Sequence, residues 1–198
     1  MNKLKKLTLK QTYPFIMVIT GSIGFIASFM LTIDLLEILK NPNFQPVCNI
    51  NPIFSCSSVM ESSASSTFGF ANPLIGIAGY AAIITIGMAL IAGATFKRWF
   101  WIGLQIGTTL AMPFLIWLFY YSLYDSKALC LFCMTVWAVT LPLFWYTTLY
   151  NFREKNINIS PKLNKFLQKH HGDILLVLYL IPVVLILNRF WYYWSTLI

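Results

Sequence analysis

Residues 73–96 read PLIGIAGYAAIITIGMALIAGATF, a stretch that contains no Asp, Glu, Lys or Arg. A helix that crosses the hydrocarbon core of a bilayer needs about 20 largely apolar residues. This stretch has both the length and the composition. It therefore predicts a transmembrane helix, which places the chain among membrane proteins.

Four other stretches have the same character, and Asp34, near the end of the first of them, is the only acidic residue that they contain. The five predicted spans cover residues 14–36, 73–96, 100–123, 130–150 and 174–196. We therefore expect an all-α membrane protein in which four spans form a transmembrane bundle and a fifth transmembrane helix follows it. Gly24 with Ser28, and Gly103 with Gly107, are pairs of small residues that favour close helix crossings.

The overall composition supports this class. Of the 198 residues, 58% are apolar and only 10% are charged, and the mean hydropathy is +0.70. A soluble domain of this size is usually about 25% charged, because its surface must be covered with polar groups. The composition thus excludes a disordered chain and a small protein held together mainly by disulfides.

The net charge of +8 is distributed unevenly along the chain. Eleven of the fourteen Lys and Arg residues lie before the first span, between the second and third, or between the fourth and fifth. The positive-inside rule then predicts a cytoplasmic N-terminus and outward-facing loops at 37–72 and 124–129. The basic excess is thus an orientation signal and does not require nucleic acid. We expect the first span to be retained as an anchor, because its apolar stretch is longer than that of a secretory signal.

Residues 151–173 form a basic cytoplasmic linker in this topology. Ser160-Pro161 opens a candidate helix with a capping residue and a first-turn proline, so the segment is either a short helix on the membrane surface or a solvated linker. His170 and His171 lie there without a neighbouring Cys or carboxylate cluster. We therefore expect no metal site at these histidines.

All four cysteines fall at the predicted outer face, where an oxidising compartment can reach them. Cys130 and Cys133 open the fourth span as a C-x-x-C motif, in which the two sulfurs share one face of a helix and the helix N-terminus favours the thiolate. Because the pair lies at the top of a span, a lipid-soluble partner could contact it.

Cys48 and Cys56 lie in the long outer loop, and this pair has two interpretations. It is either a static structural disulfide or a second redox pair, which would relay electrons from a soluble protein to the C-x-x-C motif. A zinc site made of all four cysteines is the third alternative. The spacing of Cys48 and Cys56 does not fit zinc ligation, and the outer segments contain no His.

Taken together, these residues resemble the vitamin K epoxide reductase family over about residues 14–150. The features that carry the resemblance, in chain order, are Cys48…Cys56-Ser-Ser-Val, Ser62, Phe68-Gly69, Asn72-x₃-Gly76-x₃-Tyr80 and Cys130-x-x-Cys133. In the bacterial quinone reductase that reoxidises a periplasmic disulfide donor, the C-x-x-C motif precedes the loop pair, whereas here it follows. The order of the motifs therefore favours the first family, in a prokaryotic form without a fused thioredoxin domain.

The resemblance implies how the chain is organised. Residues 1–150 would form the catalytic four-helix bundle around a quinone, with 37–72 as its external redox loop. Residues 151–173 would be the linker, and 174–198 the fifth helix.

The resemblance also implies the roles of the residues. Cys130 and Cys133 would be the active-site disulfide and Cys48 and Cys56 the shuttle pair, with Cys56 attacking Cys130 and leaving Cys133 as a thiolate that faces the quinone. Three further residues match positions at or near the quinone: Asn72, Ser62 and Trp137. Trp137 departs from the Tyr that is frequent in animal members, and its indole can only donate a hydrogen bond.

The implied function is a quinone-dependent thiol:disulfide oxidoreductase of the bacterial cytoplasmic membrane, with its active site on the outer, periplasmic face. It would reoxidise a separate, secreted thioredoxin-fold oxidase and reduce a ubiquinone-, menaquinone- or vitamin K-like quinone. The alternatives are a vitamin K quinone or epoxide reductase, and a non-catalytic membrane scaffold with structural disulfides. A transporter is disfavoured because the spans contain almost no ionisable residues.

Overall fold

The computed structural model of the 198-residue chain describes residues 9–41, 43–49, 53–60 and 62–195. Within these residues, five helices are long and apolar enough to cross a membrane. They are α1 (Leu9–Lys40), α3 (Asn72–Ile91), α4 (Arg98–Tyr124), α5 (Leu131–Arg153) and α7 (His171–Arg189). The protein is thus an all-α, multi-pass membrane protein, and the five predicted spans are confirmed.

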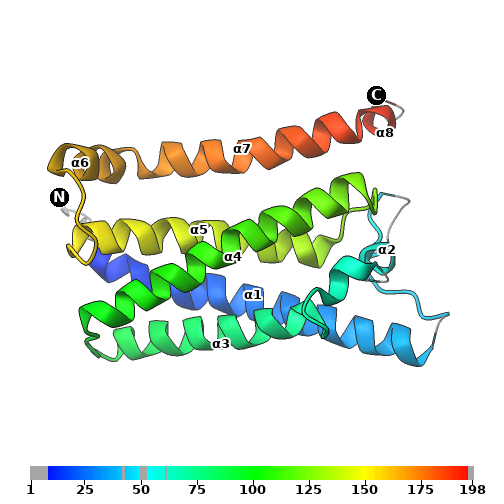
Figure 1. The fold of residues 1–198 in the computed structure, drawn as a ribbon, viewed down its shortest axis with the longest axis horizontal. Coiled ribbons are helices and arrows are strands. Elements are labelled where there is room, and N and C mark those ends of the chain that lie inside the picture. The colour runs from blue at the N-terminus through cyan, green and yellow to red at the C-terminus, as the bar shows by residue number, and fades with distance from the viewer. Residues whose placement is uncertain (1–8, 42, 50–52, 61, 196–198) are drawn as a thin grey trace, which may run out of the picture.

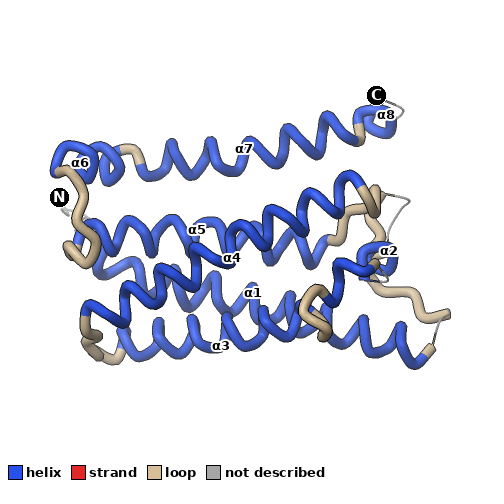
Figure 2. Tube along the Cα trace, viewed as in Figure 1, coloured by secondary structure: helices blue, strands red, loops and turns tan. Residues whose placement is uncertain are grey.

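Four shorter helices connect or follow the spans (Figure 2). They are α2 (Cys56–Met60), the 3₁₀ helix η1 (Ser63–Ser66), α6 (Pro161–Lys169) and α8 (Trp191–Trp194). The helix predicted after Ser160-Pro161 is therefore present as α6, although the Ser160 side chain makes no capping hydrogen bond.

The helices α1, α3, α4 and α5 form a bundle, and α7 runs along its outside (Figure 1). The short helix α2 lies at one end of the bundle, whereas α6 lies at the other end, where α1 begins. The basic turns around Lys97 and Arg153 also lie at the α6 end, because they connect α3 to α4 and α5 to α6. The α2 segment and these basic turns thus lie at opposite ends of the bundle.

Small residues allow α1 and α3 to approach closely. A Cβ atom added at Gly24 would collide with the Tyr80 ring, and one added at Gly76 would collide with the Ser28 hydroxyl. The crossing predicted from Gly24 and Ser28 is therefore confirmed. The prediction for Gly103 and Gly107 is wrong, because an added Cβ would meet nothing within 4 Å at either position; both residues instead line a cavity inside the bundle.

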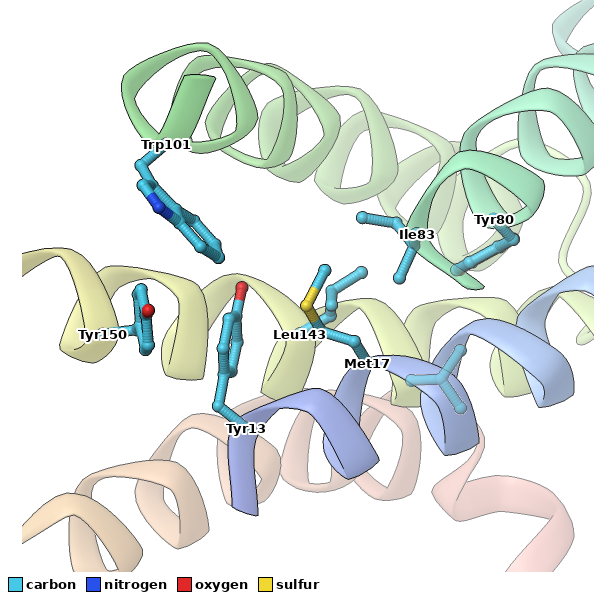
Figure 3. Close-up of a cluster of buried hydrophobic side chains, with 8 residues drawn as sticks. Tyr13, Met17, Tyr80, Ile83, Trp101, Leu143 and Tyr150 are labelled. Atoms are coloured by element: carbon cyan, nitrogen blue, oxygen red, sulfur yellow. The ribbon is translucent and has the colours of Figure 1, made fainter. Parts of the chain in front are cut away.

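At the α6 end, three aromatic residues from different helices pack together (Figure 3). We call Tyr13, Trp101 and Tyr150 the aromatic cluster. The ring centroids of Tyr13 and Tyr150 are 4.7 Å apart, and those of Trp101 and Tyr150 are 4.5 Å apart. The Tyr13 hydroxyl also hydrogen-bonds the Thr147 hydroxyl at 2.8 Å, so the cluster joins α1, α4 and α5.

Buried amides continue this junction beside the aromatic cluster. Asn151, which is fully buried, donates to Gln105 Oε1 at 3.1 Å and accepts from Asn156 Nδ2 at 3.0 Å. Arg98 Nε donates to the Asn156 carbonyl at 2.8 Å. Because buried amides are costly unless they are hydrogen-bonded, this network specifies how the α6 end of the bundle is closed.

The last span is shorter than its apolar sequence suggests. The sequence predicts a span to residue 196, but α7 ends at Arg189 and the chain turns at Phe190 before α8. The buried side chain of Phe190, which is 1% exposed, explains the turn, because it belongs to a cluster of apolar residues at the α2 end. Residues 196–198 lie outside the described part of the chain.

Candidate active site

The structure brings three of the four cysteine sulfurs into direct contact at the α2 end. Cys48 and Cys56 form a disulfide whose Cα atoms are 5.7 Å apart. The Cys56 Sγ lies 3.2 Å from the Cys130 Sγ, and Cys133 follows one helical turn later. Cys130 and Cys133 are free thiols. We call these four residues the cysteine cluster; it holds one disulfide and two thiols.

A short backbone bridge sets this contact. Phe54 and Leu129 pair in a parallel bridge, in which the Leu129 N–H donates to the Ile53 carbonyl at 2.7 Å and the Ser55 N–H donates to the Leu129 carbonyl at 3.1 Å. Cys56 and Cys130 come directly after the two bridged segments. The bridge therefore places the loop cysteine against the start of α5.

A polar network holds the loop around α2. The Asn49 amide oxygen accepts from the Ser57 N–H at 3.2 Å, and its amide nitrogen donates to the Ser57 hydroxyl at 2.8 Å. The Ser55 and Ser58 hydroxyls are 2.8 Å apart. These contacts tie the Cys48 side of the loop to the first turn of α2, which begins at Cys56.

Cys130 occupies the N-cap position of α5. The Cys133 N–H donates to the Cys130 Sγ at 3.3 Å. Hydrogen bonds from the Cys133 thiol and from the backbone N–H groups of Cys133 and Phe132 hold the pKa of the Cys130 thiol below its ordinary value, although burial opposes them. Cys130 is therefore more reactive as a nucleophile and as a leaving group than a thiol with an ordinary pKa.

A cavity of about 840 Å³ opens inside the bundle beside the cysteine cluster. Cys130 and Cys133 are part of its wall, and most of the remaining wall is apolar. The volume lies in the range of sites that bind drug-sized molecules. Residues from α1, α3, α4, α5 and α7 contribute, for example Leu31, Ile83, Leu115, Val136 and Val183.

Two of the three predicted quinone contacts line this cavity. Asn72 begins α3, where its Nδ2 donates to the Ala64 carbonyl at 2.6 Å and lies 3.4 Å from the Thr67 hydroxyl. Its Oδ1 accepts from the Thr67 N–H at 3.1 Å. Asn72 thus ties the loop at Ala64 and Thr67 to the start of α3, and Asn72 is itself part of the cavity wall.

Trp137 is the second of these residues. Its ring stacks on Phe119 with centroids 5.7 Å apart and meets Tyr179 of α7 edge-on at 6.0 Å. The Tyr179 hydroxyl donates to the Ala138 carbonyl. The fifth helix therefore packs against the α5 turn that carries Trp137.

Ser62, the third predicted residue, lies in the loop between α2 and η1. Its hydroxyl donates to the Val59 carbonyl at 2.6 Å. Val59 packs against the cysteine cluster and lines the cavity, whereas Ser62 is not part of the cavity wall described here. Ser62 is thus placed to support the loop next to the sulfurs.

Sequence reasoning missed two buried polar groups near the site. The Tyr80 hydroxyl lies 2.6 Å from the Thr140 hydroxyl and donates to the Val136 carbonyl at 3.1 Å, so it links α3 to the cavity-lining part of α5. Asp34 is 5% exposed, and its Oδ2 makes no hydrogen bond. Neither arrangement has a local sequence signal, since the partners of Tyr80 lie more than fifty residues away.

The arrangement of the thiols bears on the zinc alternative. Cys48 and Cys56 are joined to each other, so this form of the protein does not present four thiolates. Across the described residues, no three or more His, Cys, Asp or Glu side chains are grouped in a way that could hold a metal ion. The contact between the Cys56 and Cys130 sulfurs is close enough for disulfide exchange.

Comparison with known proteins identifies the family. No curated protein matches the chain. The sequence model of the vitamin K epoxide reductase family matches residues 15–148, which is more than half of the chain. The match begins within α1, ends within the last two turns of α5 and includes all four cysteines. The chain belongs to the vitamin K epoxide reductase family.

Proposed function

We propose that the protein is a quinone-dependent thiol:disulfide oxidoreductase that reoxidises a separate, secreted thioredoxin-fold oxidase. Membership of the family implies an oxidoreductase. One observation supports the proposal of disulfide exchange with quinone reduction. The Cys56 and Cys130 sulfurs are 3.2 Å apart, and Cys130 and Cys133 both line the apolar cavity. Sulfur atoms at this separation can exchange disulfide partners without moving a transmembrane helix.

The proposed relay has two internal steps and conserves electrons. A reduced partner transfers two electrons to the Cys48–Cys56 disulfide and leaves with its own disulfide restored. The Cys56 thiolate then attacks Cys130 of a Cys130–Cys133 disulfide, and Cys48 attacks Cys56 in turn, so that the loop pair is oxidised and the C-x-x-C pair is reduced. The observed pattern of one loop disulfide and two helix thiols matches the product of this relay.

A membrane quinone is the proposed electron acceptor, and as the substrate it takes up two electrons and two protons from the Cys130–Cys133 dithiol. The apolar cavity beside Cys133 supports this assignment. Asn72 and Trp137 are the proposed contacts, with Ser62 supporting the loop. The Asn72 Nδ2 has one short bond to Ala64 and one long contact of 3.4 Å to Thr67, so the N–H on the long contact is the one proposed to turn to a quinone oxygen.

The direction of electron flow follows from reduction potentials. A strongly oxidising thioredoxin-fold donor has a potential near about −120 mV, and each ~30 mV corresponds to about 1.4 kcal/mol for two electrons. Only a more positive acceptor can reoxidise such a donor, and a quinone supplies one. The separation of the redox loop from the basic segments supports an orientation with the cysteine cluster outside a bacterial cytoplasmic membrane.

The proposal is tested with the purified protein, a reduced thioredoxin-fold oxidase and a water-soluble quinone. We expect quinone reduction with stoichiometric oxidation of the partner. A vitamin K epoxide added in a parallel reaction tests the alternative of an epoxide reductase. If the partner is not oxidised and all four cysteines stay unchanged, the scaffold interpretation replaces the proposed function.

A further inference from the structure

The fifth spanning helix, α7, lies outside the four-helix bundle and outside the residues that match the family model. Its sequence indicates only an anchor. In the structure, however, the end of α7 reaches the same end of the molecule as α2 and the cysteine cluster (Figure 1). Two consecutive residues, Arg189 and Phe190, make contacts there that a simple anchor does not need.

Phe190 is buried with the residues that form the backbone bridge. It is 1% exposed and belongs to a cluster of buried side chains with Ile53, Leu123 and Leu129. Ile53 and Leu129 are the two residues whose backbones are joined at 2.7 Å. The Phe190 ring thus covers the side chains of the segments that precede Cys56 and Cys130.

Arg189 connects the end of α7 to the end of α4, next to the cluster that contains Phe190. Its Nε donates to the Leu123 carbonyl at 3.2 Å, and its guanidinium carbon lies 5.7 Å from the centre of the Tyr124 ring. Leu123 is in the last turn of α4, where backbone carbonyls lack partners within the helix. A cationic side chain at a helix C-terminus is a favourable partner for such a carbonyl.

The bridge needs such support because it is isolated. The bridge does not belong to a longer strand. Small pairs of extended segments are marginally stable in water unless they pack against other elements. The sulfur contact depends on the bridge, since this pairing joins the segment before Cys56 to the segment before Cys130. If the contacts of Arg189 and Phe190 with this region were lost, the local Cys48–Cys56 disulfide would stay intact, but Cys56 would move away from Cys130.

We propose that Arg189 and Phe190 are positioning residues of the redox centre, so that α7 holds Cys56 within exchange distance of Cys130. The proposal rests on the proposed relay. The relevant step is the attack of the Cys130 thiolate on Cys56, in which the Cys56–Cys130 bond forms, the Cys48–Cys56 bond breaks and Cys48 leaves as a thiolate. The step involves no net oxidation, and its equilibrium reports how well the two sulfurs are held together.

The test uses the full chain with Cys133→Ala, which keeps the exchange within Cys48, Cys56 and Cys130. Samples are quenched with an alkylating reagent, and mass spectrometry gives the ratio of the Cys56–Cys130 disulfide to the Cys48–Cys56 disulfide. Adding Phe190→Ala should lower this ratio about tenfold to a hundredfold, because the effective concentration of one sulfur at the other depends steeply on how well the two are positioned. Phe190→Leu, which keeps an apolar side chain, should restore most of it.

Trp191→Ala is the matched control, because Trp191 is the next residue and is 60% exposed. It should change the ratio less than about twofold, since the exchange geometry does not depend on it. Arg189→Ala leaves the apolar cluster in place and should lower the ratio severalfold, so it carries the test if the Phe190→Ala protein does not fold. An unchanged ratio in both Phe190→Ala and Arg189→Ala, or in Arg189→Ala alone if it is the only folded variant, overturns the proposal.

The outcome also separates this proposal from the proposed function. If the Cys133→Ala parent forms no Cys56–Cys130 disulfide, the relay itself fails. If the parent forms it and the variants at Arg189 and Phe190 form it equally well, the relay stands and α7 is only an anchor.

Discussion

The two ends of the bundle are built for different purposes. At the α6 end, the aromatic cluster and the buried amides around Asn151 lock α1, α4 and α5 together with close ring contacts and hydrogen bonds. At the α2 end, the same helices line an apolar cavity, and the sulfur atoms of Cys56 and Cys130 lie 3.2 Å apart beside it. The difference indicates that the α6 end, which we call the closed end, supplies stability. The α2 end, which we call the open end, is where the proposed substrate binding and disulfide exchange would take place.

The largest expected effect comes from the open end. Replacing Cys130 or Cys133 by Ala should abolish quinone reduction by every electron donor, because the dithiol that faces the cavity is lost. Quinone absorbance measures the rate. Thermal unfolding of Cys133→Ala should change little, since Cys133 does not contribute to the aromatic cluster. Cys130→Ala also removes the N-cap of α5 and should cost about 1 kcal/mol. Reduction at the parent rate in either variant would show that electrons bypass the C-x-x-C pair.

Loss of Cys48 should produce a selective defect. In Cys48→Ala, the thioredoxin-fold partner can no longer deliver two electrons to the loop pair, whereas a small dithiol can still reduce the Cys130–Cys133 disulfide directly. Quinone reduction is measured with both donors. We expect the rate with the protein partner to fall much further than the rate with the small dithiol, and an equal loss with the two donors would argue against the relay.

A substitution at the closed end should have the opposite profile. Tyr13→Ala removes a fully buried ring and should lower the free energy of unfolding by about 3–5 kcal/mol. Tyr13→Phe removes only the hydrogen bond to Thr147 and should cost about 1 kcal/mol. Denaturation followed by tryptophan fluorescence gives both values. If Tyr13→Phe changed the disulfide exchange ratio at the cysteine cluster, the two ends would not be independent.

The smallest effect is a shift in a pH profile. Because hydrogen bonds from Cys133 and Phe132 lower the pKa of the Cys130 thiol, the thiolate should form below the ordinary thiol range near about pH 8.5. In protein that lacks Cys48 and Cys56, the alkylation rate of Cys130 should therefore rise with pH and level off below that range. Cys133→Ala removes the strongest donor and should move the midpoint upward. Tyr13→Phe should leave it in place, and a parent midpoint at or above the ordinary range would contradict the hydrogen-bonded N-cap.

The sequence predicts the features that depend on local composition. Hydropathy is sufficient to identify the five spans, and the spacing of Cys130 and Cys133 is sufficient to place a thiol pair at a helix start. The ends of the helices are harder to predict from composition. The first helix continues to Lys40, beyond the apolar stretch, and a Lys40–Glu37 ion pair at 3.0 Å lies in its last turn.

The features that could not be predicted depend on contacts between distant segments. The bridge between Phe54 and Leu129 joins residues from two loops whose sequences show no strand pattern. Phe190 lies in an apolar stretch that continues past it, so its composition does not reveal that the helix ends there and that its ring turns inward. The exact position of the sulfurs follows from these long-range contacts and not from the motifs.

The most direct test of the account is to identify the disulfides in Cys133→Ala protein after rapid alkylation. The account predicts a peptide pair linked through Cys56 and Cys130, together with alkylated Cys48, because the two sulfurs lie 3.2 Å apart. Recovery of the Cys48–Cys56 disulfide alone, with Cys130 fully alkylated at every exchange time, would contradict it.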